Sequence, residues 1–236
     1  MGGFMFPFYF DPTYVLVIIG IILSLGASAR VKSTFARYSQ VRSMSGLTGA
    51  QAAERILQSS GIYDVQVERV SGQLSDHYDP RAKVLRLSDS VYASNSIAAI
   101  GVAAHECGHA IQDNHNYVPL KVRGALVPVA NFGSMAAFPL ILIGLLLAGS
   151  QTLIDFGIIL FSIAVVFQLV TLPVEFNASS RAIARLGETG ILYDEELRQT
   201  KKVLDAAALT YVAAAAATLL QLLRLIILFG GGRNRD

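Results

Sequence analysis

Residues 156–174 read FGIILFSIAVVFQLVTLPV and carry no charged side chain. A helix needs about 20 apolar residues to cross the hydrocarbon core of a bilayer, so this run is long enough to span one. Three other uncharged runs of similar or greater length occupy residues 12–29, 124–154 and 206–223. The chain of 236 residues is 53% hydrophobic and 15% charged, whereas soluble domains are about 25% charged. The sequence therefore predicts a mainly α-helical membrane protein with about four transmembrane helices.

Two of these runs need closer placement. The run 124–154 is longer than one span requires, so we expect a helix at about residues 125–148, a tight turn at 149–151 and a helical hairpin with the next run. The run 206–223 contains five consecutive alanines, which are only mildly apolar, and Arg224 follows it directly. This segment is expected either to span the membrane with Arg224 snorkelling near its end or to be a core helix.

The Lys and Arg residues indicate how the chain is oriented. They follow the first run, precede the second, follow the third and precede the fourth, with Arg233 and Arg235 as the exception. By the positive-inside rule, residues 30–123 and 175–205 lie in the cytoplasm, while the turn between the second and third runs and both termini lie outside. The predicted segments are 1–29 with the first span, 30–123 in the cytoplasm, 124–174 as the transmembrane hairpin, 175–205 in the cytoplasm and 206–236 with the fourth span and tail.

The cytoplasmic segments contain their own helix and strand signals. A capping box at Thr48 and Gln51 opens a helix that is expected to end near Gly61. Alternating apolar and polar residues at 65–70 and 83–87 predict two strands of a small sheet. Two more helices are predicted, one over about residues 97–113 after the cap Ser94-Asn95-Ser96, and one from Asp194 that runs continuously into the fourth span. The cytoplasmic part is therefore expected to be an α+β region with a small β-sheet.

The predicted helix over 97–113 contains the sequence His105-Glu106-Cys107-Gly108-His109. Residues four apart on a helix lie about 40° from each other, so both imidazoles can reach one Zn²⁺ ion. Glu106 projects about 100° from His105, which suits a base that acts on metal-bound water. The alternative is a chance match on an ordinary amphipathic helix, and it is disfavoured because the motif uses two of only four histidines. Cys107 is expected to be a small buried residue that faces away from the histidines.

A catalytic zinc site needs a third protein ligand. Glu175 is the preferred candidate, because a membrane hairpin would return it to the first cytoplasmic region, at the head of a helix of small residues. His115 lies six residues after His109, where the extended metzincin pattern has its third histidine, but the glycine of that pattern is absent. His77 is the remaining alternative.

Three stretches of the chain resemble the YugP-like neutral zinc metallopeptidases of bacterial membranes. These stretches are residues 75–88, residues 96–112 (SIAAIGVAAHECGHAIQ) and residues 172–182 (LPVEFNASSRA). The layout is more distantly similar to the HtpX-type membrane proteases. The resemblance implies a zincin-like catalytic region with one zinc per chain, in the bacterial plasma membrane. It also implies His105, His109 and Glu175 as ligands and Glu106 as the base.

The chain departs from the HtpX pattern at one position. Ser179 stands where that pattern has an aspartate, so Asn177 or Ser179 is expected to hydrogen-bond a ligand instead.

The expected activity is metal-assisted hydrolysis of peptide bonds in membrane-associated or unfolded proteins. A tetrahedral oxyanion needs a further hydrogen-bond donor, for which His77, Tyr78 and Arg181 are candidates. The predicted strand of Val84, Leu85, Arg86 and Leu87 offers a backbone edge to which an extended substrate could add.

The lipid bilayer is an expected partner. A second copy of the chain and another membrane protein are two further possible partners. Nucleic acid is excluded because no basic block with interleaved aromatic residues is present. The single cysteine excludes an internal disulfide.

Three rival functions fit the sequence less well. A site-2-type intramembrane protease would carry the motif within a span, but the uncharged run before His105 begins only at Ser90 and is polar at 94–96. A zinc-stabilised scaffold or chaperone subunit has no use for Glu106 as a base. A transporter is disfavoured because Arg224 is the only charged residue within the four candidate spans, so no polar pathway is evident.

Overall fold

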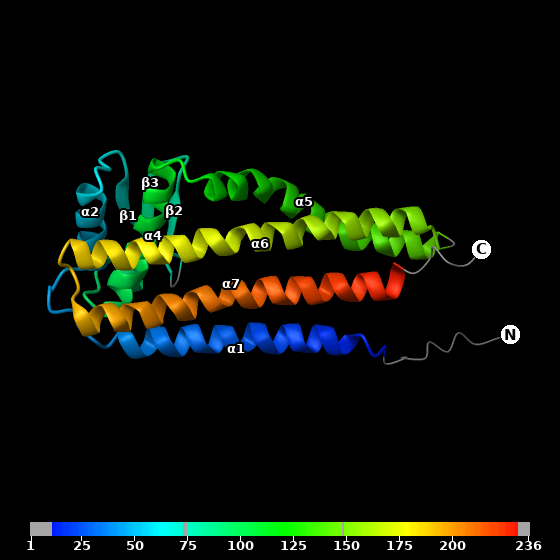
Figure 1. Ribbon diagram of the computed structural model, residues 1–236, viewed down its shortest axis with the longest axis horizontal. Helices are drawn as coiled ribbons and strands as arrows, with labels where there is room; N and C mark the ends of the chain where they lie inside the picture. The colour runs from blue at the N-terminus through cyan, green and yellow to red at the C-terminus, as the bar shows by residue number, and fades with distance from the viewer. Residues whose placement is uncertain (1–10, 73–74, 148, 231–236) are drawn as a thin grey trace.

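The computed structural model describes residues 11–72, 75–147 and 149–230. Four long helices dominate these residues, and each is long and apolar enough to cross a membrane. Figure 1 shows them extending along the longest axis of the molecule, with a small α/β region at one end. The predicted four-helix membrane architecture is therefore confirmed at the level of helix length and composition. The long helices are α1 (Tyr14–Tyr38), α5 (Val118–Leu146), α6 (Gln151–Glu188) and α7 (Asp194–Phe229).

The α/β region forms between α1 and α5 in the chain. Thr48 and Gln51 make the predicted reciprocal capping box, and the Ser96 side chain accepts a hydrogen bond from the backbone N–H of Ala99. Both predicted helices are therefore confirmed within one or two residues. The elements of the region are α2 (Gly49–Ser59), β1 (Gln66–Val70), β2 (His77–Asp79), β3 (Val84–Ser88), α3 (Asp89–Tyr92) and α4 (Ile97–Asn114).

The sheet has three strands in the order β1-β3-β2, one more than the sequence predicts. Strand β3 pairs parallel with β1 and antiparallel with β2, where Tyr78 is opposite Leu85. The expectation that Val84, Leu85, Arg86 and Leu87 form a free edge is therefore wrong. They lie in the central strand, where partners on both sides use the backbone groups that an incoming strand would need. Strand β2 is one of the two outer strands, and it contacts α4.

The hairpin of α5 and α6 is confirmed, but α5 begins at Val118 rather than near residue 125. Pro119 stands in the first turn, a position where its missing N–H costs no hydrogen bond. Farther along, a Cβ at Gly133 would lie 2.8 Å from the carbonyl oxygen of Leu160, so the two backbones are in close contact there. Figure 1 shows the first half of α5 bending away from α6, in line with Pro128 inside the helix.

Helix α6 continues without a break from the hairpin turn to Glu188, and α7 runs from Asp194 through the fourth uncharged run as predicted. Glu175 was expected at the head of a new helix, and this is wrong because it lies inside α6. Pro173 removes one backbone donor from α6 without ending it. Because the helix is continuous, the span and Glu175 belong to one rigid element.

Arg224 lies near the far end of α7, opposite the α/β region. Its guanidinium is 3.5 Å from the Asp11 carboxylate and 4.3 Å from the centre of the Tyr14 ring. An arginine so close to the end of an apolar helix can pair with groups at the membrane interface. This position fits the spanning interpretation of α7 better than the core-helix interpretation. Arg233 and Arg235 lie outside the described residues.

Candidate metal centre

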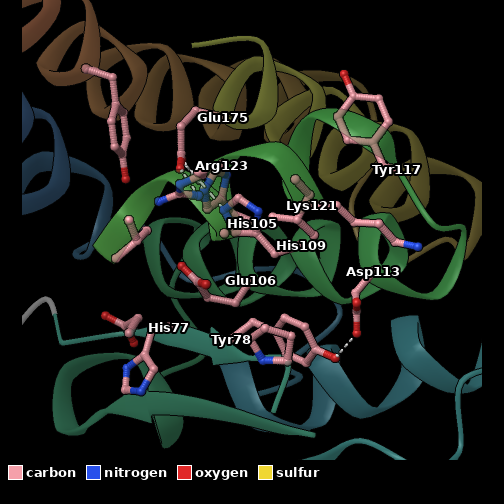
Figure 2. Close-up of a pocket in the computed structure, with 16 residues that line it drawn as sticks. His77, Tyr78, His105, Glu106, His109, Asp113, Tyr117, Lys121, Arg123 and Glu175 are labelled. Carbon is pink, nitrogen blue, oxygen red and sulfur yellow. Dashed lines mark hydrogen bonds and ion pairs between the residues drawn. The ribbon is translucent and has the colours of Figure 1, made fainter. Parts of the chain in front are cut away.

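Helix α4 presents His105 and His109 to one side chain of α6. The Nε2 atom of His105 lies 3.2 Å from Oε2 of Glu175, and Nε2 of His109 lies 3.7 Å from the same oxygen. The Glu175 side chain is only 2% exposed. Figure 2 shows the two rings and the carboxylate converging on one point. The structure thus brings together the two histidines and the preferred third residue of the sequence analysis.

This convergence depends on a close helix contact one residue from the histidines. Gly108 faces the backbone of Ala178, and a Cβ at position 108 would overlap the Ala178 carbonyl oxygen. Ala178 is itself fully buried. Only a residue without a side chain allows α4 and α6 to approach this closely, and the approach sets the distance between His109 and Glu175.

The other ring nitrogen of each histidine is hydrogen-bonded, which fixes the orientation of the rings. Nδ1 of His105 lies 3.1 Å from Oγ of Ser179, and Nδ1 of His109 lies 3.0 Å from Oε1 of Gln112. Ser179 is thus the polar partner in the place where the HtpX-type pattern has an aspartate. Ordered partners on the far nitrogen are typical of histidines that bind metal ions.

The Gln112 amide is held in one orientation. Its Nε2 donates to the carbonyl oxygen of Val174 at 2.8 Å and to Oδ1 of Asn177 at 3.0 Å. Because the amide nitrogen is used in this way, Oε1 must face His109 and accept from Nδ1–H. His109 then has its free lone pair on Nε2, the atom that faces Glu175. Asn177 acts one step farther out than the sequence suggests, since it holds Gln112 and not a histidine.

Asn177 also links this network to Arg181. Arg181 Nε donates to Asn177 Oδ1 at 2.8 Å, and its guanidinium lies 3.2 Å from Nδ1 of His115 and 5.9 Å from the centre of the Tyr117 ring. Arg181 does not line the cavity beside the histidines, so its predicted role as an oxyanion donor has no geometric support. The same contact places His115 with Arg181, away from Glu175.

The donor atoms fit a zinc ion in kind and in spacing. One donor atom each from His105, His109 and Glu175 lies within 4.8 Å of the others. Two ligands at 2.0–2.1 Å from a tetrahedral zinc are about 3.3 Å apart, and the two nitrogen-to-oxygen distances of 3.2 and 3.7 Å lie close to this value. Two imidazoles and one carboxylate form a ligand set that is typical of catalytic zinc.

The carboxylates of Glu106 and Glu175 favour a positive charge near the histidines. Burial lowers the pKa of His109, but the Glu175 hydrogen bond and the nearby Glu106 carboxylate outweigh burial, so the pKa is raised above its usual value. Arg123 of α5 places Nη1 2.9 Å from Oε1 of Glu175. Glu175 therefore faces the histidines with one oxygen and Arg123 with the other.

A cavity of about 460 Å³ opens beside these residues. Figure 2 shows Glu106 pointing into it from α4, and the Glu106 residue is 8% exposed. The cavity lies between β2, which contributes His77 and Tyr78, and the first turns of α5. Its volume is within the usual range for sites that bind small molecules or peptide side chains. Cys107 faces away and is fully buried, as predicted.

The other two predicted oxyanion donors line this cavity in different ways. The Tyr78 hydroxyl donates to Oδ2 of Asp113 at 2.9 Å, so its proton points away from the histidines. Burial and this hydrogen bond raise the pKa of Tyr78. His77 lies on β2 with Nδ1 2.8 Å from the backbone oxygen of Ser75. Neither His77 nor His115 joins the three residues that could hold a metal.

Several residues of the site have no counterpart among the sequence predictions, and one of them is Gln112, which holds His109. Arg123 was interpreted only as a charge that orients the membrane spans, and Tyr211, which also lines the cavity, lies within the predicted fourth span. The one available signal was position: Arg123 directly precedes an uncharged run, and Tyr211 is the only hydroxyl-bearing aromatic residue in the fourth run.

Comparisons with known proteins agree with this geometry. Residues 13–230 match a family described as "Putative neutral zinc metallopeptidase". Among curated proteins, the chain is 52% identical over 221 residues to "Putative membrane protease YugP" of Bacillus subtilis (strain 168), and the aligned region covers 94% of this chain and 98% of that protein. No solved structure matches the chain.

Proposed function

The chain belongs to the neutral zinc metallopeptidase family, and on that premise we propose that it is a zinc endopeptidase embedded in the bacterial plasma membrane. Its substrates are polypeptides that are unfolded or attached to the membrane. Hydrolysis takes place at the cytoplasmic surface, where α4 and the sheet meet the long helices.

One observation carries the proposal: His105, His109 and Glu175 converge from two helices beside a cavity that also receives Glu106. These three residues would hold one zinc ion. Zinc at such a site supplies Lewis-acid chemistry, which activates water and polarises the substrate carbonyl. A purely structural zinc site is usually closed by four protein ligands, whereas only three such groups converge among the described residues.

Glu106 is the proposed general base. Its carboxylate accepts a proton from the attacking water and returns this proton to the amine that leaves. The position fits this role, because Glu106 follows His105 directly on α4 and points into the cavity instead of toward Glu175. Arg123 and His77 are the proposed donors for developing negative charge, since both line the same cavity.

Strand β2 is the proposed binding edge for the substrate backbone. It is one of the two outer strands of the sheet and lines the cavity through His77 and Tyr78, while the central strand β3 is paired on both sides. An extended polypeptide could pair with β2 beside the metal ligands. Folded proteins do not offer a free extended segment, so this mode of binding selects unfolded substrates.

The proposed orientation places the α/β region in the cytoplasm. Helix α1 starts and helix α7 ends at the end of the molecule that is farthest from the α/β region (Figure 1). This arrangement is expected if both termini are outside. The basic residues that flank the spans at the α/β end follow the positive-inside rule. A cysteine-accessibility assay in intact cells tests this orientation.

Metal analysis and one substitution test the function. Purified protein is expected to contain about one zinc per chain, and Glu106→Gln is expected to keep the zinc but lose at least 1000-fold in hydrolysis of reduced, carboxymethylated casein. Retained cleavage by Glu106→Gln would exclude this base. Full zinc occupancy with no cleavage by the intact chain would favour the zinc-stabilised scaffold.

A further inference from the structure

One face of α5 forms a wall of the cavity. Tyr117, Leu120, Gly124 and Val127 recur at intervals of three and four residues, and all four line the cavity. This spacing places them on one side of a helix, with Leu120, Gly124 and Val127 near its middle. The middle of the wall is therefore apolar, although the cavity beside it contains charged groups.

Gly124 leaves this wall open. A Cβ at position 124 would meet no atom within 4 Å, whereas a Cβ at Gly133 of the same helix would lie 2.8 Å from the backbone of α6. Close packing therefore explains Gly133 but not Gly124. Glycine in a helix interior is unfavourable compared with alanine. Among the described residues, no packing contact requires a glycine at position 124. The missing side chain leaves additional space in the cavity.

The opening lies beside the metal ligands. Arg123, the residue before Gly124, contacts Oε1 of Glu175 at 2.9 Å and so ties this turn of α5 to the metal centre. The other nearby cation, Lys121, donates to Oδ1 of Asn116 at 2.7 Å. Both charged groups have partners of their own, and Leu120 and Val127 are the apolar side chains that flank Gly124 on this face of α5.

We propose that Leu120, Gly124 and Val127 form a subsite for a bulky apolar side chain of the substrate, next to the bond that is cleaved. This inference rests on the proposed function and names the substrate class that the site prefers. Phenylalanine, leucine and similar side chains gain most from an open apolar wall. A difference of one methylene group in such a pocket changes selectivity by roughly 10- to 200-fold, so filling the space should have a large effect.

Two hydroxamates that differ only in one substituent test the subsite without requiring cleavage. The hydroxamate group binds zinc, and the substituent is either benzyl or methyl. We expect the zinc-loaded full chain in detergent to bind the benzyl compound at least tenfold more tightly by calorimetry. Gly124→Leu should reduce this preference to less than threefold, and Gly124→Ala should give an intermediate value. Ala125→Leu is the matched control, because Ala125 is exposed and does not line the cavity.

The outcomes separate the subsite from the proposed function. Equal binding of the two hydroxamates by the intact chain, or a benzyl preference that survives Gly124→Leu, would overturn the subsite. A benzyl preference that Gly124→Leu removes, in a protein that cleaves no unfolded casein, would support the subsite and contradict the peptidase function. In a cleaving protein, mass spectrometry of casein fragments should show cuts beside large apolar residues, and Gly124→Leu should shift these cuts to sites with small residues.

Discussion

Gly108 of α4 and Ala178 of α6 are in direct backbone contact, with no room for a Cβ at position 108. The contact lies one residue before His109 and one residue before Ser179, the hydrogen-bond partner of His105. A helix crossing between two backbones thus sets the spacing of the three candidate metal ligands. Small changes in this crossing move both histidines relative to Glu175.

Replacing Gly108 by alanine should push α4 and α6 apart. We expect a loss of stability of about 1–3 kcal/mol, as found when a packed site is overfilled, together with at least a tenfold loss of zinc affinity. Competition with a fluorescent chelator measures the affinity, and thermal unfolding measures the stability. Gly26→Ala is the control, because a Cβ there meets nothing within 4 Å. Unchanged zinc binding in Gly108→Ala would show that the crossing does not set the ligand geometry.

Gln112→Leu should release His109 from its fixed tautomer. Loss of an outer hydrogen-bond partner typically costs about 10- to 100-fold in metal affinity, and the same range is expected here. In cobalt-substituted protein, the visible spectrum should also change, which a simple loss of stability would not cause. Gln58→Leu, on the exposed side of α2, serves as the comparison. Wild-type affinity and spectrum in Gln112→Leu would remove the assigned role of the amide.

Arg123→Met should leave Oε1 of Glu175 buried without its cation. An unsatisfied buried group costs about 1–3 kcal/mol, so the melting temperature of the zinc-free protein should fall. Arg123→Lys should restore part of this loss, since it keeps the charge but not the guanidinium geometry. Lys202→Met removes an exposed cation elsewhere and should change little. If the two methionine variants melt alike, the ion pair is not a structural element of the site.

Tyr78→Phe should retain hydrolysis within about threefold, because a hydrogen bond of about 1 kcal/mol to Asp113 is all that it removes. Burial and Asp113 raise the pKa of Tyr78 above its usual value of 10, so the hydroxyl stays protonated throughout the neutral and mildly alkaline range. The pH profiles of the intact chain and the variant should therefore coincide up to pH 10. A loss of 100-fold or more in kcat would instead identify Tyr78 as an oxyanion donor.

The sequence predicted the parts of the site that depend on local geometry. The spacing of His105 and His109 is a property of one helix, and the Thr48 cap is a property of one turn. Glu175 was predicted because a hairpin between two spans returns the chain to its starting side. These inferences need only helix periodicity and span length.

Other parts depend on tertiary contacts that leave no periodic signal. Strand β2 has only three residues, too few for an alternating pattern, so its pairing and the central place of β3 were missed. Arg123 carries the same charge as the other basic residues that flank the membrane spans. Its contact with Glu175 can be recognised only in the folded structure. Tyr211 joins the cavity because α7 packs beside α6.

The unbroken α6 has a consequence for how the proposed activity can be isolated or inherited. The shortest continuous piece of chain that holds all three candidate metal ligands runs from residue 105 to residue 175, and it contains all of α5, the hairpin turn and α6 as far as Glu175. No water-soluble fragment cut from one side of the hairpin can hold the complete ligand set. Gene rearrangements that transfer this chemistry to another protein would have to move two membrane helices along with it.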